Sequence, residues 1–293
     1  MLAFITSLRH PLNSSDYAHV EELLAQTLGS VTAQTSDDFA VFVVGNRMPD
    51  FELPRRTTFV PVDFPPPVAT SGPRFALGPF VRDKGTKIGI GLAAARAVHP
   101  DHVMIFDADD FVHRGLAALS QSAPTAPGWV VEEGLIYSRT RQAWRVQRDF
   151  NRTCGTCHVV AWEAYGVPDD LEVTATQDEV AAAFGERLER IIGAHRQGRE
   201  WLAEHGYPLE PLPFHGAVYH VDTGENHSGK GLRGLARPLS DRVVRDFGIP
   251  RLASPSASIG RALDPRELAY TAQSALSRAT RITKGALARQ AKA

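Results

Sequence analysis

Three aspartates lie close together directly after a short apolar run near the middle of the chain. The run is residues 103–106 (VMIF), and Asp107, Asp109 and Asp110 follow it. Such a run is typical of a strand buried on both faces, and open α/β sheets bind ligands at the carboxyl ends of their strands. Crowded carboxylates repel one another unless a cation lies between them, and oxygen ligands suit Mg²⁺ or Mn²⁺ shared with phosphate oxygens. The residues therefore predict a metal and diphosphate site.

The elements that must position these acids alternate as in a doubly wound sheet. Apolar runs predict strands at residues 2–6, 39–44, 57–62, 103–106, 154–162 and 217–221, and a hairpin at residues 129–137 and 143–146. Helical spacing of apolar residues predicts helices at residues 16–30, 84–97, 114–120 and 179–196. The sequence therefore predicts an α/β fold, with a mixed, mostly parallel sheet and helices on both faces.

Composition and charge are those of an ordinary soluble protein. The chain has 293 residues, of which 43% are hydrophobic, a formal net charge of -1 and a sequence pI near 6.8. This balance does not indicate a nucleic-acid partner. No segment resembles a secretory signal or reaches the roughly 18–20 apolar residues of a membrane helix, so we expect a cytoplasmic protein.

The two cysteines form the motif CGTCH with His158. Cys154 and Cys157 have the spacing of covalent haem attachment and of a redox pair. Haem attachment requires export, however, and a redox pair belongs at the start of a helix, whereas this motif runs into the apolar residues 159–162. We therefore expect two reduced, structural cysteines.

The segment before the aspartates resembles the middle of family 2 glycosyltransferases and their relatives with the GT-A fold. It contains Lys84, Lys87, the helical stretch GLAAA and the run HPDHVMIFDADD. The first strand, the following helix and the FAVFVVG strand are also similar, so the resemblance covers roughly residues 1–230. It implies a GT-A-like, Rossmann-like fold and a metal-dependent glycosyltransferase. Its implied cofactor is Mn²⁺ or Mg²⁺, and its donor substrate is a nucleotide-diphosphate sugar.

The resemblance also implies roles for single residues. Asp109 corresponds to the direct metal ligand, with Asp110 beside it as the alternative. Asp107 corresponds to the residue that meets the donor ribose, or the metal through water. The positions that correspond to contacts with the nucleotide are Thr6, Ser7, Arg9 and Lys87. The second strand ends in Gly-Asn-Arg where the family usually has an acidic nucleotide contact, so the base stays open.

Transfer of a sugar with inversion requires a general base that takes the proton of the acceptor hydroxyl. The resemblance places this base in an acidic pair at the head of a later helix, and Asp178 is the matching residue. Thr176 and Glu179 also form a capping-box pattern, and an acid at a helix N-terminus is stabilised there without a catalytic role. If Asp178 is not the base, a retaining mechanism becomes an alternative.

A histidine from a late loop completes the metal site in many relatives. His227, in DTGENHSGKG, is the residue that corresponds to it, because its loop follows a predicted strand. A plain surface histidine is the alternative interpretation. His215 and His220 are weaker candidates, since the first follows a proline-rich turn and the second lies in the strand.

Other functions fit parts of the same pattern. A strand ending in Asp-x-Asp also resembles the first motif of haloacid-dehalogenase-type phosphatases, although several strands precede it here. A sugar nucleotidyltransferase shares the sheet but requires a glycine- and arginine-rich loop after the first strand, where this chain has SLRHPLNSS. A degenerate transferase domain that only binds is the non-enzyme alternative. The acceptor, whether carbohydrate, lipid or small molecule, is not indicated.

The chain changes character towards its end. We expect residues 1–238 to form the nucleotide-sugar-binding and catalytic domain, and residues 239–293 to form a basic C-terminal extension that is helical. Residues 261–293 contain seven Lys or Arg against two acids. One interpretation is a basic helix that makes peripheral contact with an anionic membrane or with a partner. The other is a solvated terminal helix, because its apolar face is weak.

Overall fold

The computed structural model describes the chain apart from residues 69–77, 226–230, 253, 268, 272 and 274–293. The chain divides into two compact units. The first unit comprises Met1–Leu135, Val146–Tyr219 and Arg242–Pro250, and the second comprises Ile136–Arg145, His220–Asp241 and Arg251–Ala293. The domain boundary expected after residue 238 stays a prediction.

The first unit is built on a seven-stranded sheet with the order β10-β6-β9-β4-β1-β2-β3. Its strands are β1 (Leu2–Ser7), β2 (Phe39–Gly45), β3 (Thr57–Pro61), β4 (His102–Ile105), β6 (Gly128–Val130), β9 (His158–Ala161) and β10 (Glu210–Pro211). Strands β1 to β4 are parallel, β10 is parallel to β6, and β9 is antiparallel to both β4 and β6. Only β9 of this sheet therefore runs against the rest, which confirms the predicted mixed, mostly parallel sheet.

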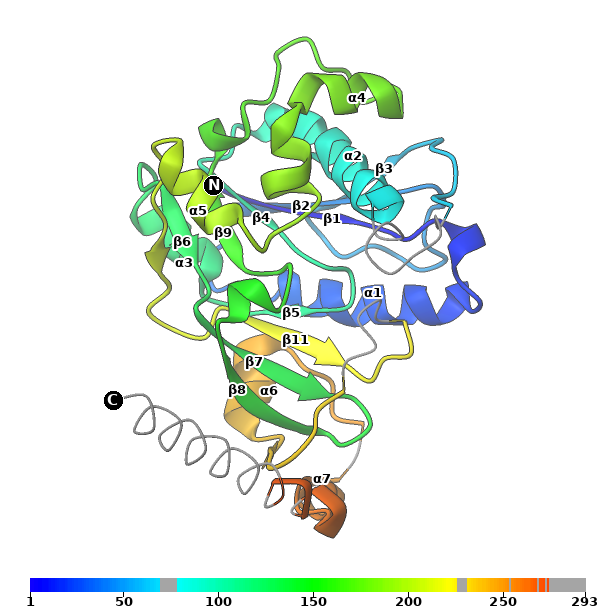
Figure 1. The fold of residues 1–293 in the computed structure, drawn as a ribbon, viewed down its shortest axis with the longest axis vertical. Coiled ribbons are helices and arrows are strands. Elements are labelled where there is room, and N and C mark those ends of the chain that lie inside the picture. The colour runs from blue at the N-terminus through cyan, green and yellow to red at the C-terminus, as the bar shows by residue number, and fades with distance from the viewer. Residues whose placement is uncertain (69–77, 226–230, 253, 268, 272, 274–293) are drawn as a thin grey trace, which may run out of the picture. The chain divides into compact units, whose positions relative to one another are not determined.

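Helices cover both faces of this sheet, as predicted. Figure 1 shows α1 below β1 and β2 and α2 above them. The described part of the chain contains the helices α1 (Tyr17–Val31), α2 (Gly78–Ala95), α3 (Leu116–Ser122), α4 (Gln177–Phe184), α5 (Gly198–Glu204), α6 (Asp241–Phe247) and α7 (Pro255–Ala262). Short 3₁₀ helices lie at Pro11–Asn13, Arg96–Val98, Phe150–Arg152 and Trp162–Tyr165, and Leu188–Ile192 is a short π-helix.

Two glycines explain how closely α2 lies against its neighbours. A Cβ atom added at Gly91 would lie 2.4 Å from Cγ2 of Ile5 in β1, and one added at Gly89 would lie 2.5 Å from Cγ1 of Val180 in α4. Both distances are shorter than a contact between carbon atoms allows. The glycines therefore set the depth at which α2 packs, and with it the position of the side chains near its start.

Three local predictions were correct only in part. The helix predicted at residues 179–196 ends at Phe184, because Gly185 has a φ of 52° and stops the helix. The predicted hairpin is present as β7 (Glu133–Ser138) beside β8 (Ala143–Arg148), but its first strand is shorter than predicted, since β6 joins the central sheet. The strand predicted from residue 154 begins only at His158, and the CGTC residues before it form a loop.

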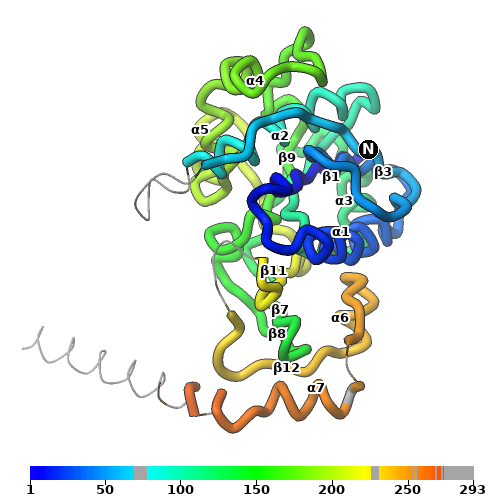
Figure 2. Tube along the Cα trace, turned by 90° about the vertical axis from the view of Figure 1, so that its right-hand side faces the viewer, coloured from blue at the N-terminus to red at the C-terminus, as the bar shows by residue number. Residues whose placement is uncertain are grey.

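The second sheet has the order β12-β8-β7-β11-β5. Its strands are β5 (Phe111–Val112), β7 (Glu133–Ser138), β8 (Ala143–Arg148), β11 (Ala217–Val221) and β12 (Arg237–Pro238). In the second unit α7 packs along β12, as Figure 2 shows. Among the described residues, no helix is both long enough and apolar enough to cross a membrane.

Candidate metal centre

The order of the strands places the aspartates at a switch point of the sheet. From β1 the chain continues to β2 and β3 on one side, and β4 is added on the other side of β1. Ile5 of β1 lies beside Ile105 of β4, and the Phe106 N–H donates to the Ile5 carbonyl at 3.0 Å. Thr6 and Asp107 therefore follow at the same edge. In open α/β sheets the crevice beyond the strand ends at such a point is where ligands bind.

The acids meet a thiol at this edge. Asp107, Asp110 and Cys154 each offer a ligand atom, and these atoms lie within 4.8 Å of one another. Asp109 lies between the two acids in a tight turn that the Asp110 N–H closes by donating to the Asp107 carbonyl at 3.1 Å. A group of this kind could hold a metal ion.

The loop that contains the CGTC motif forms hydrogen bonds with Asp110 and Asp107. The Cys154 thiol donates to Oδ2 of Asp110 at 2.9 Å, and the Thr156 hydroxyl donates to the same oxygen at 2.6 Å. The Thr156 hydroxyl also accepts from the Asp107 N–H at 2.9 Å. A Cβ atom added at Gly155 would lie 2.8 Å from Oδ2 of Asp107. Both cysteines are free and buried, as predicted, but their loop contacts the site, which was not predicted.

The electrostatics of the cluster show an excess of negative charge. Burial acts to raise the pKa of Asp107, but the ion pair with Lys84, the charge of His195 and a backbone N–H lower it below its ordinary value. Burial and then the Asp107 charge raise the pKa of Asp109 to about 7. Burial, followed by the charges of Asp109 and Asp107, raises the pKa of Asp110 well above its ordinary range. The nearby cations therefore do not neutralise all three acids.

This donor set fits a divalent cation. Burial and then the Asp110 charge raise the pKa of the Cys154 thiol, which keeps its proton and donates it to Asp110. A protonated thiol is a poor ligand, whereas the carboxylate oxygens of Asp107 and Asp110 are hard donors. Asp109, the predicted direct ligand, is not part of this group, and its ligation of a metal stays a prediction. Hard oxygen donors with unneutralised charge are the surroundings that Mg²⁺ and Mn²⁺ prefer.

The residues predicted to bind the nucleotide lie at the ends of β1 and on α2. Thr6 is buried, and its hydroxyl has no hydrogen-bond partner among the described residues. Ser7 is half-buried at the last position of β1. The charge of Arg9 acts on Asp109 and lowers its pKa, which places the guanidinium on the side of the acids. Contact of these residues with a nucleotide stays a prediction.

Lys87 lies in a buried ion pair. Its ammonium donates to Oδ2 of Asp83 at 2.9 Å and to the Leu8 carbonyl at 3.0 Å, and its side chain is 0% exposed. Burial lowers the pKa of Lys87 and raises that of Asp83. The pair therefore ties α2 to the segment after β1, and the nucleotide contact predicted for Lys87 stays untested.

Replacing Lys87 with methionine is expected to destabilise the protein by about 3 kcal/mol, because it leaves the Asp83 carboxylate buried without its partner. Urea denaturation at neutral pH measures this loss. The control is the double variant Asp83→Leu/Lys87→Met, which removes both charges and should recover most of the stability. Equal losses in the single and the double variant would show that packing, and not the unpaired charge, determines the effect.

The two remaining predicted residues are placed differently. Asp178 is 94% exposed, forms an ion pair with Arg82 of α2, and lies in the first turn of α4. The capping box between Thr176 and Glu179 is present, as the alternative interpretation expected. His227 lies outside the described residues. A catalytic role of Asp178 and metal ligation by His227 both stay predictions.

Sequence reasoning missed four residues of this site. Lys84 was noted only as part of a family resemblance, Cys154 only as a structural residue, and Thr156 only as a member of the CGTCH motif. His195, whose charge acts on Asp107, was not noted at all. The lysine lies 23 residues before its partner and the cysteine 44 residues after its own, so no local pattern connects them.

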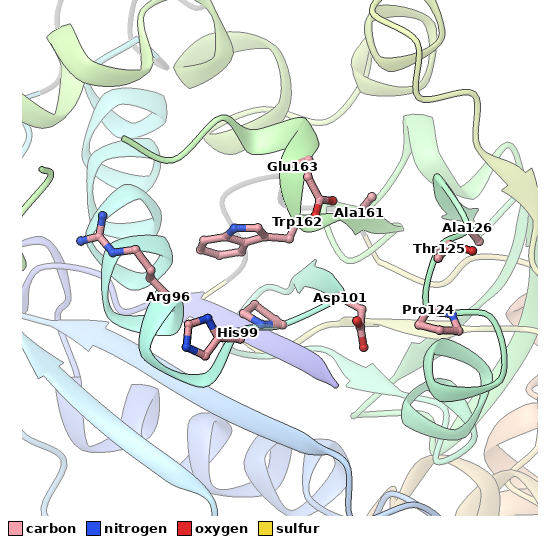
Figure 3. Close-up of a pocket in the computed structure, with 10 residues that line it drawn as sticks. Arg96, His99, Asp101, Pro124, Thr125, Ala126, Ala161, Trp162 and Glu163 are labelled. Atoms are coloured by element: carbon pink, nitrogen blue, oxygen red, sulfur yellow. The ribbon is translucent and has the colours of Figure 1, made fainter. Parts of the chain in front are cut away.

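A pocket of about 550 Å³ lies at the other edge of the sheet. Figure 3 shows the Trp162 indole near its centre, with Arg96 and His99 on one side and Asp101 on the other. These residues precede β4 or follow the antiparallel β9, so they lie at the amino end of β4. The pocket therefore lies away from the aspartates.

Comparison with known proteins gives only distant matches. No family model and no curated protein matches the chain. The solved structure of TarS from S. aureus matches with a TM-score of 0.36 and 11% identity, over 75% of this chain and 36% of that one. The 2-C-methyl-D-erythritol 4-phosphate cytidylyltransferase from Thermus thermophilus matches with a TM-score of 0.31 and 13% identity, over 89% of this chain and 96% of that one. Matches this distant do not identify a reaction, so the function is argued from the site.

Proposed function

We propose that the protein is a metal-dependent glycosyltransferase, which moves a sugar from a nucleotide-diphosphate donor to an acceptor hydroxyl. The observation that supports this best is the group of three buried or half-buried acids with unneutralised charge at the switch point of the sheet. The donor diphosphate is itself anionic, so a site for it must combine cations with these acids. The DxD sequence of Asp107 and Asp109 is consistent with such a site.

The acids and the cations of this site would bind different parts of the donor complex. Asp109, with Asp107 or Asp110, would hold the ion. A bound Mn²⁺ or Mg²⁺ would neutralise the charge that develops on the leaving diphosphate. Lys84 and Arg9 lie within electrostatic reach of the same acids and would bind phosphate oxygens beside the ion.

The carboxyl end of β1 would hold the nucleoside. Thr6 has a hydroxyl that lacks a partner among the described residues, and Ser7 is next to it at the carboxyl end of β1. A ribose or base edge offers the hydrogen bonds that such a buried hydroxyl requires. Lys87, held by Asp83, would act here by keeping the segment after β1 in place.

For the second substrate we propose an inverting reaction in which Asp178 accepts the proton of the acceptor hydroxyl. Asp178 is exposed at the start of α4, where an acceptor from solvent could reach it. His227 would add a ligand to the ion from its loop. The acceptor would be a carbohydrate, a lipid or another small molecule with a free hydroxyl.

A thermal-shift panel tests the proposal. UDP, GDP and CDP are added to the wild-type protein, each with Mn²⁺ or with EDTA. Binding at about 100 times Kd stabilises by about 2.7 kcal/mol, which raises Tm by about 5–10 °C for a protein of this size. We expect one diphosphate to give this shift with Mn²⁺ and none of them to give it with EDTA.

The rival functions give different patterns in the same panel. A phosphatase should respond to inorganic phosphate and phosphate monoesters, and a nucleotidyltransferase to nucleoside triphosphates and pyrophosphate. A binding module without activity should show the diphosphate shift but release no nucleotide from a sugar donor. No response to any diphosphate in the presence of Mn²⁺ would exclude the transferase.

A further inference from the structure

The two units of the chain carry opposite charge. The first unit contains 18 Lys or Arg against 28 Asp or Glu, whereas the second contains 14 Lys or Arg against 5 Asp or Glu. The near-neutral charge of the whole chain therefore hides a strongly basic unit of 75 residues. The positive charge of such a unit attracts anionic partners that come within about one Debye length of its surface.

Helix α7 of this unit buries small residues and exposes its large apolar residue. Among the side chains of α7 that the structure describes, Ser258 and Ala262 are buried, at 2% and 1% exposure, and both are small. Ile259 within the helix and Leu263 at its C-cap are 49% and 52% exposed. A helix of a soluble protein normally turns its large apolar residues to the core. The apolar side of α7 therefore faces outward.

Hydrogen bonds fix α7 in this orientation. The Ser258 hydroxyl donates to the Gln142 carbonyl at 2.6 Å and accepts from the Leu239 N–H at 3.1 Å. The Arg141 guanidinium donates to the Ala262 carbonyl at 3.2 Å. A rotation that buried Ile259 would break these bonds. The exposure of the apolar side chains is thus a built feature of the unit.

Basic residues accompany the exposed apolar residues. Among the residues of the unit that the structure describes, five large apolar side chains are exposed: Leu235, Leu252, Ile259, Leu263 and Tyr270. Arginines with exposed side chains lie near four of them in the sequence: Arg233, Arg237, Arg261 and Arg266, of which Arg233 also pairs with Glu267. The Arg251 side chain is only 28% exposed and pairs with Asp241. Along residues 233–237 an arginine, a leucine and an arginine occur at every second position. Apolar groups flanked by cations are the combination that binds the interface of an anionic bilayer.

We propose that the second unit binds the surface of an anionic lipid bilayer through α7, through Leu263 and Arg266 just after it, and through the residues 233–237. The apolar side chains would enter the headgroup region, and the arginines would lie against lipid phosphates. A nucleic acid offers the same charge, but its protein partners use aromatic and hydrogen-bonding groups more than exposed aliphatic ones. The aliphatic residues therefore favour the bilayer. This inference is independent of the reaction proposed above.

Vesicle co-sedimentation of the full chain tests this inference. The vesicles are phosphatidylcholine alone, and phosphatidylcholine mixed with about one third phosphatidylglycerol. We expect at least about tenfold stronger binding to the anionic vesicles, and a loss of several-fold when the salt concentration is raised from about 0.1 to 0.5 M. Equal binding to both vesicle types, or binding to neither, would overturn the proposal.

Matched variants separate the apolar and the charged contributions. Ile259→Ser/Leu263→Ser, which removes both apolar side chains without a change of charge, should lower binding at least about tenfold, whereas Val173→Ser, at an exposed apolar residue of the first unit, should leave it unchanged. Arg266→Glu should weaken binding more than Arg55→Glu, which changes the net charge equally in the first unit. All of these positions are exposed, and circular dichroism checks that the variants are folded.

Two further results would overturn the proposal. One is vesicle binding by the Ile259→Ser/Leu263→Ser variant at wild-type strength. The other is tighter binding of duplex DNA or of structured RNA than of the anionic vesicles at equal salt, which would assign the basic unit to a nucleic acid. Both use the same protein preparations.

Discussion

The variant Asp109→Ala is expected to lose more than about 100-fold of its affinity for the diphosphate in the presence of Mn²⁺, because even outer-shell partners of metal sites are worth about 10–100-fold. Asp109 is the acid whose pKa is raised to about 7, by burial and by the Asp107 charge. A cation that replaces the proton on this acid relieves the repulsion. Without the carboxylate, the ion and the diphosphate it bridges both lose a ligand.

Stability should change in the opposite direction. Removing one of three crowded acids relieves repulsion in the folded state, so Tm of Asp109→Ala without metal should equal or exceed that of the wild type. Calorimetric titration with the responding diphosphate, with Mn²⁺ and with EDTA, measures the affinity. The control is Asp170→Ala, at an exposed acid outside the site. Wild-type affinity in Asp109→Ala, with and without Mn²⁺, would exclude the proposed site.

The second large effect is expected for Asp178→Asn, which should lower kcat about 10²–10⁴-fold if Asp178 is the general base. The asparagine keeps the size of the side chain but cannot accept the proton. Binding of the donor should stay within a few-fold of the wild type, because Asp178 is not among the acids at the end of β4. Release of nucleoside diphosphate from the donor measures kcat.

The same helix turn provides a matched control for this variant. Glu179→Gln removes an equal charge one residue away and preserves the capping box, because glutamine also accepts that geometry. Its kcat should stay within about threefold of the wild type. Similar small losses in both variants would reduce Asp178 to an acid that stabilises a helix start. The anomeric configuration of the product would then decide whether the reaction retains.

Local patterns were sufficient for the elements at the start of the fold. β1, β2 and α1 lie within one residue of their predicted bounds, because each is a continuous apolar run or a clear helical spacing. The position of Asp107 at a strand end followed from the same pattern. Where a glycine with positive φ interrupts a good helical spacing, as at Gly185, the pattern alone overestimates the helix.

The surroundings of the acids could not be predicted in the same way. The pairing of Lys84 with Asp107 and of Cys154 with Asp110 depends on how α2 and the loop before β9 pack on the sheet. The apolar residues after CGTCH also favoured a strand over a loop at Thr156. A hydrogen bond between distant segments leaves no periodic trace in either of them.

The opposite charges of the two units have a practical consequence for work with the protein. A formal net charge of -1 suggests a molecule without electrostatic character, yet at low ionic strength the acidic unit of one copy and the basic unit of another attract each other. Such a protein is least soluble in dilute buffer and becomes more soluble as added salt shortens the Debye length from about 30 Å at 0.01 M to about 8 Å at 0.15 M. Binding of anionic partners is best measured at intermediate salt concentration, where copies of the protein no longer associate but the basic unit still attracts anionic surfaces.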